Sequence, residues 1–175
     1  MVKPPKTSYV SNRVLKLNVG FLLNDGPAHS HETTFDAPAV RITDDLTVRH
    51  IRGTLRLSRT KEGILVQGKL HVGLEGECYR CLDPVLTDAA IHIEELYATT
   101  PGKAEFRIFE DGILDLAPLL RDEVLIILSR GLLCSDTCRG LCPECGANLN
   151  HTTCSCRDND IDPRFARLKE LLDRN

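Results

Sequence analysis

The chain has 175 residues, of which 42% are hydrophobic and 27% are charged, and its formal net charge is −3 at pH 7. This length suits one domain, or one domain with a small appendage, and the composition excludes disorder throughout the chain. The net charge also excludes a general polycation, so binding to nucleic acid would require a local basic patch.

No segment is apolar enough to predict a membrane span or an export signal. The longest wholly aliphatic run, Val124 to Leu128, is far shorter than the roughly 20 residues of a spanning helix. Lys16, Asn18, Asn24 and Asp25 interrupt the only candidate for the apolar part of a signal peptide. We therefore expect a soluble protein that stays in the cytoplasm.

Three regions are expected along the chain. Residues 1–12 contain two prolines and are expected to form a flexible leader, residues 13–131 a body of strands and one helix, and residues 132–175 a cysteine-rich segment with a C-terminal helix. At the start of the body, a first strand is predicted from Arg13 to Leu22. Gly, Pro, Asn and Ser residues then mark Asn24 to Glu32 as a loop.

Alternation with a period of two between Leu46 and Tyr97 predicts antiparallel strands. A change of parity near His50 predicts a bulge or a break, and residues 59–63 predict a hairpin connection. A third strand is expected from Leu86 to Tyr97, so that the strands form a long, bent antiparallel sheet or a partial barrel. The clearest alternation places one set of residues on a single face: Ile64, Val66, Gly68, Leu70, Val72, Leu74 and Gly76.

One long helix is predicted after the sheet, over residues 116–130. Asp115 can cap its start, and Gly131 can end it. A short C-terminal helix is expected from Asp162 and Pro163 onward. The whole pattern predicts an α+β fold with the long helix packed on the sheet. The apolar stripe of this helix consists of Leu116, Leu119, Leu120, Val124, Ile127 and Leu128.

Eight cysteines are the strongest chemical signal in the sequence. Six of them fall within the 23 residues from Cys134 to Cys156. Disulfides suit small secreted domains, whereas this clustering in a cytoplasmic chain favours metal. Residues 132–160 contain too few apolar side chains to form a core of their own, which also favours metal as the element that orders them.

Cys142 and Cys145 have the spacing of a zinc knuckle. Two intervening residues let one tight turn present both sulfurs to a tetrahedral ion, and Gly146 permits the backbone geometry that follows. Cys154 and Cys156 can supply the other two ligands. We therefore predict a structural zinc site at these four thiols.

A second zinc site is predicted from Cys78, Cys81, Cys134 and Cys138, because neither pair completes a site alone. Such a site would clamp the end of the sheet to the end of the long helix. In the alternative grouping, Cys134 and Cys138 would join the pair at positions 142 and 145. We prefer the first grouping, which gives two zinc ions per chain.

No catalytic residue is predicted. Two closed sets of four thiols leave no open metal position, and no Ser/His/Asp arrangement, phosphate loop or paired-carboxylate motif is present. His151 could replace one cysteine, but a solvated loop histidine is the better interpretation. The less favoured alternatives are an iron–sulfur protein, a nuclease and a thiol oxidoreductase.

Charge is unevenly distributed along the chain. Residues 1–81 contain 12 Lys and Arg against 8 Asp and Glu, whereas residues 82–123 contain 3 against 10. The acidic stretch could bind a basic protein, and the basic residues could bind RNA phosphates. An ordinary charged strand face is the alternative interpretation. The candidate RNA-binding residues are Arg49, Arg52, Arg56, Arg59, Lys61 and Arg80.

Four segments of the sequence resemble the YceD-like family of bacteria and plastids: CYRCLDP (78–84), CRGLCPECGANLN (138–150), CSC (154–156) and IDPRFARL (161–168). The resemblance covers residues 13–173. It implies a non-enzymatic role in the accumulation of large-subunit (23S) ribosomal RNA, through processing of its precursor or through ribosome assembly.

The partners implied by this resemblance are a ribosomal RNA precursor, a large-subunit ribosomal protein, or both. Neither a membrane nor a small-molecule substrate is expected. The alternative is a zinc-stabilised adaptor that binds other proteins outside ribosome biology.

Overall fold

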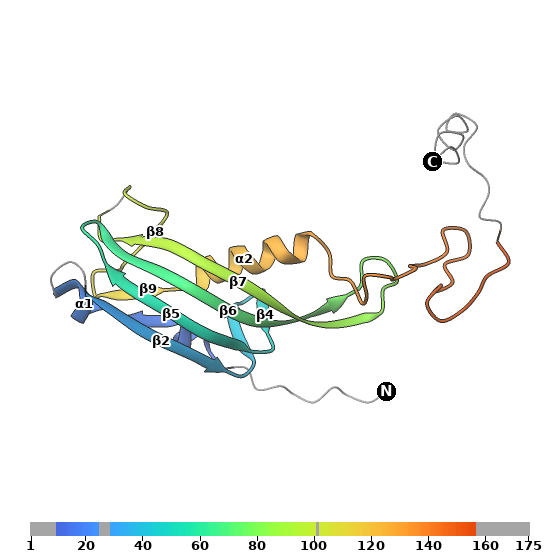
Figure 1. Ribbon diagram of the computed structural model, residues 1–175, viewed down its shortest axis with the longest axis horizontal. Coiled ribbons are helices and arrows are strands. Elements are labelled where there is room, and N and C mark those ends of the chain that lie inside the picture. The colour runs from blue at the N-terminus through green and yellow to red at the C-terminus, as the bar shows by residue number, and fades with distance from the viewer. Residues whose placement is uncertain (1–9, 25–28, 101, 157–175) are drawn as a thin grey trace.

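The computed structural model describes residues 10–24, 29–100 and 102–156 (Figure 1). The first nine residues of the expected leader and the expected C-terminal helix lie outside this part of the chain. The described elements are η1 (Asn12–Leu15), β1 (Lys16–Asn18), α1 (Gly20–Asn24), β2 (Ser30–Ala37), β3 (Val40–Thr43), β4 (Leu46–Val48), β5 (Ile51–Arg59), β6 (Gly63–Glu77), β7 (Pro84–Ala98), β8 (Phe106–Arg107), β9 (Ile113–Asp115) and α2 (Ala117–Ser129).

A five-stranded sheet in the order β2-β5-β6-β7-β8 forms the body of the protein. Its strands are antiparallel except for the β7–β8 pair, which is parallel. Two small sheets, β1–β9 and β3–β4, accompany it, and the described strands form no closed barrel. The predicted α+β fold with a mainly antiparallel sheet is therefore confirmed.

The alternation in the sequence places the strands correctly. Along β6, the predicted apolar face is buried at Ile64, Val66, Leu70, Val72 and Leu74. The change of parity near His50 marks a real break, because β4 ends at residue 48 and pairs with β3, while β5 begins at residue 51 and pairs with β2 and β6. The predicted hairpin between β5 and β6 is also present.

Helix α2 lies on one face of the sheet (Figure 1) and shares one hydrophobic core with it. Asp115 directly precedes the N-cap residue Leu116, and its Oδ1 accepts a hydrogen bond from the amide of Ala117, the first residue of the helix, at 2.9 Å. After the helix ends, Gly131 has a φ of +81°, which a side chain would strain. The other face of the sheet is polar and exposed at Arg52, Lys69 and His92.

The prediction of a single strand from Arg13 to Leu22 was wrong, because η1, β1 and α1 occupy this segment. Side chains start the two turns: Ser11 Oγ accepts from the amide of Arg13 at 3.2 Å, and Asn18 Oδ1 accepts from the amide of Gly20 at 3.1 Å. Such local hydrogen bonds compete with an extended strand.

The predicted loop from Asn24 to Glu32 is wrong at both of its ends. Residue 24 ends α1, and residues 30–32 begin β2, which pairs with β5 along its whole length. Most of β2 is polar and exposed, so its pairing rather than an apolar pattern defines it. Among the described helices, none is long and apolar enough to cross a membrane.

Candidate metal centres

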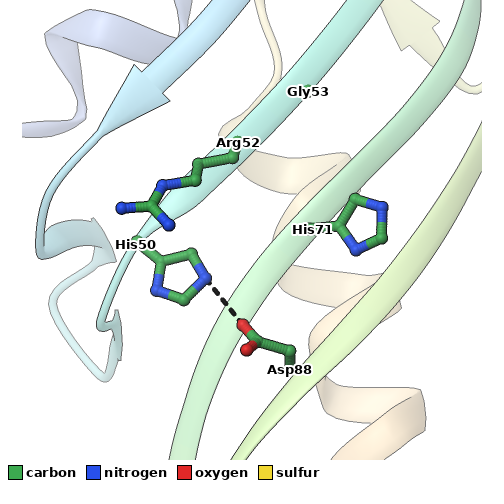
Figure 2. A pocket seen from close by; sticks show the side chains of 5 residues that line it. All are labelled: His50, Arg52, Gly53, His71 and Asp88. Atoms are coloured by element: carbon green, nitrogen blue, oxygen red, sulfur yellow. Dashed lines mark ion pairs between the residues drawn. The ribbon is translucent and has the colours of Figure 1, made fainter.

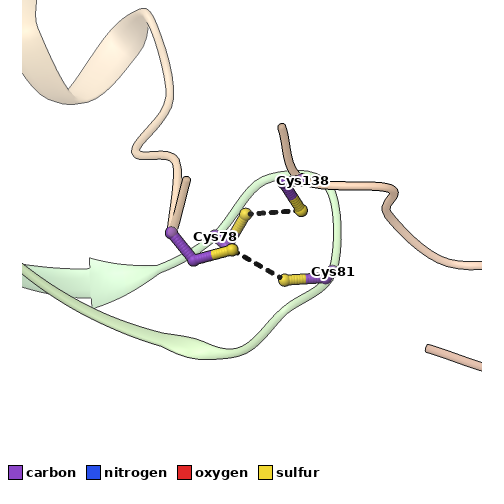
Figure 3. A group of neighbouring side chains, drawn as sticks. Cys78, Cys81 and Cys138 are labelled. Atoms are coloured by element: carbon purple, nitrogen blue, oxygen red, sulfur yellow. Dashed lines mark hydrogen bonds between the residues drawn. The ribbon is translucent and has the colours of Figure 1, made fainter. Parts of the chain in front are cut away.

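The thiols of Cys78, Cys81, Cys134 and Cys138 form one cluster where β6 ends and β7 begins, with all four Sγ atoms within 4.8 Å of one another. Figure 3 shows the thiols of Cys78, Cys81 and Cys138 pointing toward a common centre. The Sγ atoms of Cys78 and Cys138 are 3.8 Å apart, and those of Cys81 and Cys134 are 3.5 Å apart.

These distances fit a tetrahedral zinc ion. Four sulfurs at about 2.3 Å from such an ion lie about 3.8 Å from one another. A disulfide would instead require about 2.05 Å between two sulfurs, and all eight cysteines are free. The cluster therefore has the geometry of a closed four-thiolate site rather than of two disulfides.

Backbone hydrogen bonds build this first cluster from segments that are distant in sequence. The amide of Cys78 donates to the carbonyl of Asp83 at 2.8 Å, and the amide of Leu82 donates to the carbonyl of Cys78 at 2.8 Å, which closes a tight turn. The amide of Tyr79 donates to the carbonyl of Leu132 at 3.0 Å. This last bond brings the segment after α2 beside the turn.

A small hydrophobic cluster surrounds the first set of thiols and is separate from the main core. It contains Cys78, Cys81, Val85, Leu132 and Cys138. Three of its five buried members are thiols, so few aliphatic contacts hold this end of the protein together. A metal ion at the thiols would supply the missing cross-link.

The surroundings favour the thiolate form of two of these residues. Burial alone would raise the pKa of Cys78, but hydrogen bonds from the backbone of Cys134, Cys81 and Arg80 lower it to about 6. The side-chain amide of Asn150 lowers the pKa of Cys138. Burial raises the pKa of Cys81. Because zinc binds thiolates, the lowered pKa values of Cys78 and Cys138 favour metal binding at this cluster.

The thiols of Cys142, Cys145, Cys154 and Cys156 form a second cluster, again with all Sγ atoms within 4.8 Å of one another. The amide of Gly146 donates to the carbonyl of Cys142 at 2.9 Å, and the φ of +70° at Gly146 is the geometry that its sequence position predicts. Hydrogen bonds from the backbone of Cys145 and residue 144 lower the pKa of Cys142 to about 7.

The structure brings the eight thiols together in the two groups of four that the sequence indicates. Cys134 and Cys138 lie with Cys78 and Cys81, and not with the pair at positions 142 and 145. His151 belongs to neither cluster. Its side chain is exposed, and its Nε2 lies 3.0 Å from Oδ2 of Asp83.

Three polar residues that the sequence analysis did not single out connect the two clusters. The Nδ2 of Asn148 donates to both carboxylate oxygens of Asp83 at 3.0 Å. The Nδ2 of Asn150 donates to the Sγ of Cys138 at 3.3 Å. No periodic pattern marks these residues, and the only sequence signal is their position between cysteines in a segment that resembles the family.

The candidate RNA-binding residues do not form one continuous stripe. Arg52 lies on the exposed face of β5, with Nε 3.2 Å from Oδ1 of Asp36, and Arg56 donates to the hydroxyl of Ser30 at 3.2 Å. The side chain of Arg59 turns back to its own hairpin, where Nη1 donates to the carbonyls at residues 60 and 63 at 2.6 and 2.9 Å.

The remaining three candidates are widely separated. Arg49 is exposed in the connection between β4 and β5. Lys61 precedes β6 and Arg80 follows it, so these two lie at opposite ends of a strand of 15 residues, which is roughly 50 Å long at about 3.3 Å per residue. The guanidinium of Arg80 donates to the carbonyl of Cys138 at 3.2 Å and lies 5.6 Å from the ring centre of Tyr79.

A shallow cavity of about 390 Å³ lies on the sheet and is lined by His50, Arg52, Gly53, His71 and Asp88 (Figure 2). The imidazole of His50 is 2.7 Å from the carboxylate of Asp88. Because its lining includes both Arg52 and Asp88, the cavity presents both signs of charge.

The fold and the two thiol clusters define a protein with an α+β body and two candidate metal centres. The chain belongs to the YceD family: residues 66–172 match the family described as large ribosomal RNA subunit accumulation protein YceD. The matched segment contains all eight cysteines.

Several proteins are similar in sequence. An uncharacterized protein of Mycobacterium tuberculosis is 34% identical over 125 residues, which are 67% of this chain and 60% of that protein. The chloroplastic large ribosomal RNA subunit accumulation protein YCED homolog 1 of Arabidopsis thaliana is 31% identical over 61 residues, 35% of this chain and 19% of that protein.

The Zea mays protein of the same name is 35% identical over 52 residues, 29% of this chain and 18% of that protein. The chain thus spans 60% of the length of the mycobacterial relative. No solved structure matches the chain.

Proposed function

We propose that this protein is a non-enzymatic zinc protein that supports the accumulation of large-subunit (23S) ribosomal RNA, by helping to process its precursor or to assemble the subunit. The observation that carries the proposal is the pair of closed four-thiol clusters within the segment that matches the family. We propose that the protein acts in the cytoplasm, because its free thiols suit a reducing compartment.

Zinc is the metal that best fits these clusters. Four sulfur ligands in a tetrahedral arrangement are typical of structural zinc, whereas catalytic zinc keeps one position open for water or substrate. Bound zinc would supply a rigid cross-link, worth roughly 10–16 kcal/mol in small zinc peptides. The cysteines at positions 78 and 81 would hold the sheet end, and those at positions 134 and 138 would hold the segment that follows α2.

We propose as partners the ribosomal RNA precursor, a large-subunit ribosomal protein, or both. Arg52 and Arg56 support the RNA interaction, because both are exposed on the polar face of the sheet, opposite α2. Arg49 and Lys61 are exposed cations in the connections before and after β5. Arg80 is an exposed cation beside the first thiol cluster. The acidic stretch of residues 82–123 would suit a basic ribosomal protein.

Depletion of the protein from cells tests this function. We expect mature 23S ribosomal RNA to fall relative to 16S, and the protein to sediment with precursors of the large subunit. Wild-type protein should restore the 23S level. Unchanged 23S together with no sedimentation with these precursors would refute the proposal.

A variant pair tests the RNA surface separately. Arg52→Ala combined with Arg56→Ala should weaken crosslinking to RNA and restore 23S poorly. Arg13→Ala combined with Arg130→Ala removes the same charge from exposed residues that lie outside the five-stranded sheet and should behave as wild type. Equal crosslinking of the two double variants to RNA would show that the polar face of β5 does not contact RNA.

A further inference from the structure

We infer that the two metal sites are coupled: the loop of residues 148–151, which the second site holds in place, donates hydrogen bonds that complete the first site. Loading either site therefore raises the affinity of the other. This inference rests on the zinc binding proposed above and adds an interaction between the two ions that neither thiol cluster implies alone.

The first link reaches a metal-binding sulfur directly. The Nδ2 of Asn150 donates to the Sγ of Cys138 at 3.3 Å. The other end of this amide is fixed, because its Oδ1 accepts from the backbone amide of Arg139 at 2.8 Å. The backbone amide of Asn150 in turn donates to Oδ1 of Asn148 at 3.0 Å. The nitrogen that faces the sulfur is thus held there by the loop itself.

The second link reaches the turn that presents Cys78 and Cys81. Asp83 ends this turn, and its carbonyl accepts from the amide of Cys78 at 2.8 Å. Its carboxylate accepts two hydrogen bonds of 3.0 Å from Asn148 and lies 3.0 Å from Nε2 of His151. The turn and the loop therefore hold each other through one carboxylate.

The loop depends on the second site for its own order. It lies between Cys145 and Cys154, and none of the described residues after Cys138 belongs to either hydrophobic cluster. A few backbone bonds fix it, among them the amide of Leu149 to the carbonyl of Gly140 at 2.9 Å. Without metal at the second site, little would oppose the conformational entropy of the loop.

Coupling between two binding sites is reciprocal, so the factor by which one ion strengthens the other is the same in both directions. Hydrogen-bond donors around a metal ligand typically change metal affinity by roughly 10–100-fold. We expect a coupling factor in this range.

Zinc competition against a colorimetric chelator, on the full chain under reducing conditions, tests the coupling. In the wild-type background, Asn150→Ala should lower the total affinity for two zinc ions by roughly 10–100-fold. When Cys142→Ser and Cys145→Ser have already removed the second site, the first site should be weaker by a similar factor. Asn150→Ala should then change it by less than about threefold, because the loop is already released.

Thr153→Ala is the matched control, since Thr153 is exposed and lies two residues after the loop, in the same segment between Cys145 and Cys154. The hydrogen bonds that link this segment to Cys138 and Asp83 come from residues 148, 150 and 151, and not from Thr153. It should leave both affinities unchanged. An equal effect of Asn150→Ala in both backgrounds would show that Asn150 acts locally, and would overturn the coupling. An effect no larger than that of Thr153→Ala would also overturn it.

The zinc content of the wild-type protein separates this failure from failure of the proposed function. Two ions per chain without coupling would refute only the inference. Fewer than two ions would refute the proposed pair of zinc sites, and the coupling with it. Circular dichroism of each variant shows whether the sheet is retained, and Asn150→Ala leaves all eight thiols in place.

Discussion

The imidazole of His50 reaches across strand β6 to Asp88 on β7, with Nε2 of His50 2.7 Å from Oδ1 of Asp88 (Figure 2). Gly73, the β6 residue paired with Asp88, lies against the ring: a Cβ there would be 2.6 Å from Cε1 and Nδ1 of His50. The amide of Gly73 also donates to the carbonyl of His50 at 3.0 Å. Because Gly73 has no side chain, the connection between β4 and β5 can pack against the sheet at this position.

Gly73→Ala should lower the free energy of unfolding by about 1–3 kcal/mol, because the new methyl group displaces the ring of His50 and breaks its contact with Asp88. Urea denaturation measures this loss. In a His50→Ala background the same substitution should cost much less, since the clashing ring is gone. An equal cost in both backgrounds would show that the ring is not the obstacle.

The ion pair between Asp45 and Arg121, 2.7 Å from Oδ2 to Nη2, joins the β3–β4 hairpin to α2. Hydrogen bonds from Arg121 and Thr43 hold the pKa of Asp45 below its ordinary value of 3.8. A carboxyl with a lowered pKa stabilises the fold above that ordinary value, and loses this contribution as the pH falls below it.

Asp45→Asn should therefore melt at a lower temperature than wild type at pH 7, and the difference should begin to shrink once the pH falls below the ordinary pKa of 3.8 and go on shrinking toward pH 3. Melting scans between pH 7 and pH 3 measure this convergence. Asp44→Asn, at the neighbouring exposed position, should show little difference at any pH. A difference for Asp45→Asn that grows toward low pH would contradict the assignment.

Leu82 follows Cys81 in the first cysteine turn and has a φ of +62°. The corresponding residue of the second cysteine turn is Gly146, with a φ of +70°. This conformation costs a side chain of this kind roughly 1–2 kcal/mol. Glycine removes the strain but loses some conformational entropy, so Leu82→Gly should raise the free energy of unfolding by about 0.5–1 kcal/mol.

Leu86→Gly provides the opposite case, because Leu86 is similarly exposed but lies in strand β7. It should lower the free energy of unfolding by about 0.5–1 kcal/mol. Denaturant titration of both variants, with zinc present, measures the two signs. Destabilisation by Leu82→Gly would show that the leucine side chain contributes more than its backbone strain costs.

The two thiol clusters should differ in what they stabilise. Cys81 is buried between the sheet end and the segment after α2, so Cys81→Ser should lower the melting temperature by about 10 °C or more. The partners of Cys142 are all local, so Cys142→Ser should release the C-terminal segment and leave the sheet intact. A larger fall in melting temperature for Cys142→Ser would reverse these roles.

Much of this structure could be predicted because short-range chemistry determines it. The two-residue spacings at Cys78 and Cys142 indicate metal-binding turns, and the alternation from Ile64 to Leu74 indicates a strand buried on one face. Asp115 before the helix and the apolar stripe that follows it indicate α2. In each case the residues that carry the signal are neighbours in sequence.

The rest depends on contacts between distant residues. The apolar pattern of β2 is too weak to predict a strand, and the pairing with β5 is what defines β2. Arg59 has the sequence character of a surface cation but binds the carbonyls of its own hairpin. The role of Asn150 depends on its contact with the Sγ of Cys138, 12 residues earlier in the chain. No local sequence pattern predicts such a contact.

The zinc content of the purified chain tests the central claim most directly. Protein kept reduced should contain two zinc ions per chain by elemental analysis, and X-ray absorption should find four sulfurs at about 2.3 Å around each ion. Fewer than two ions, another metal such as iron, or nitrogen or oxygen ligands in place of sulfur would contradict the assignment of two closed four-cysteine zinc sites.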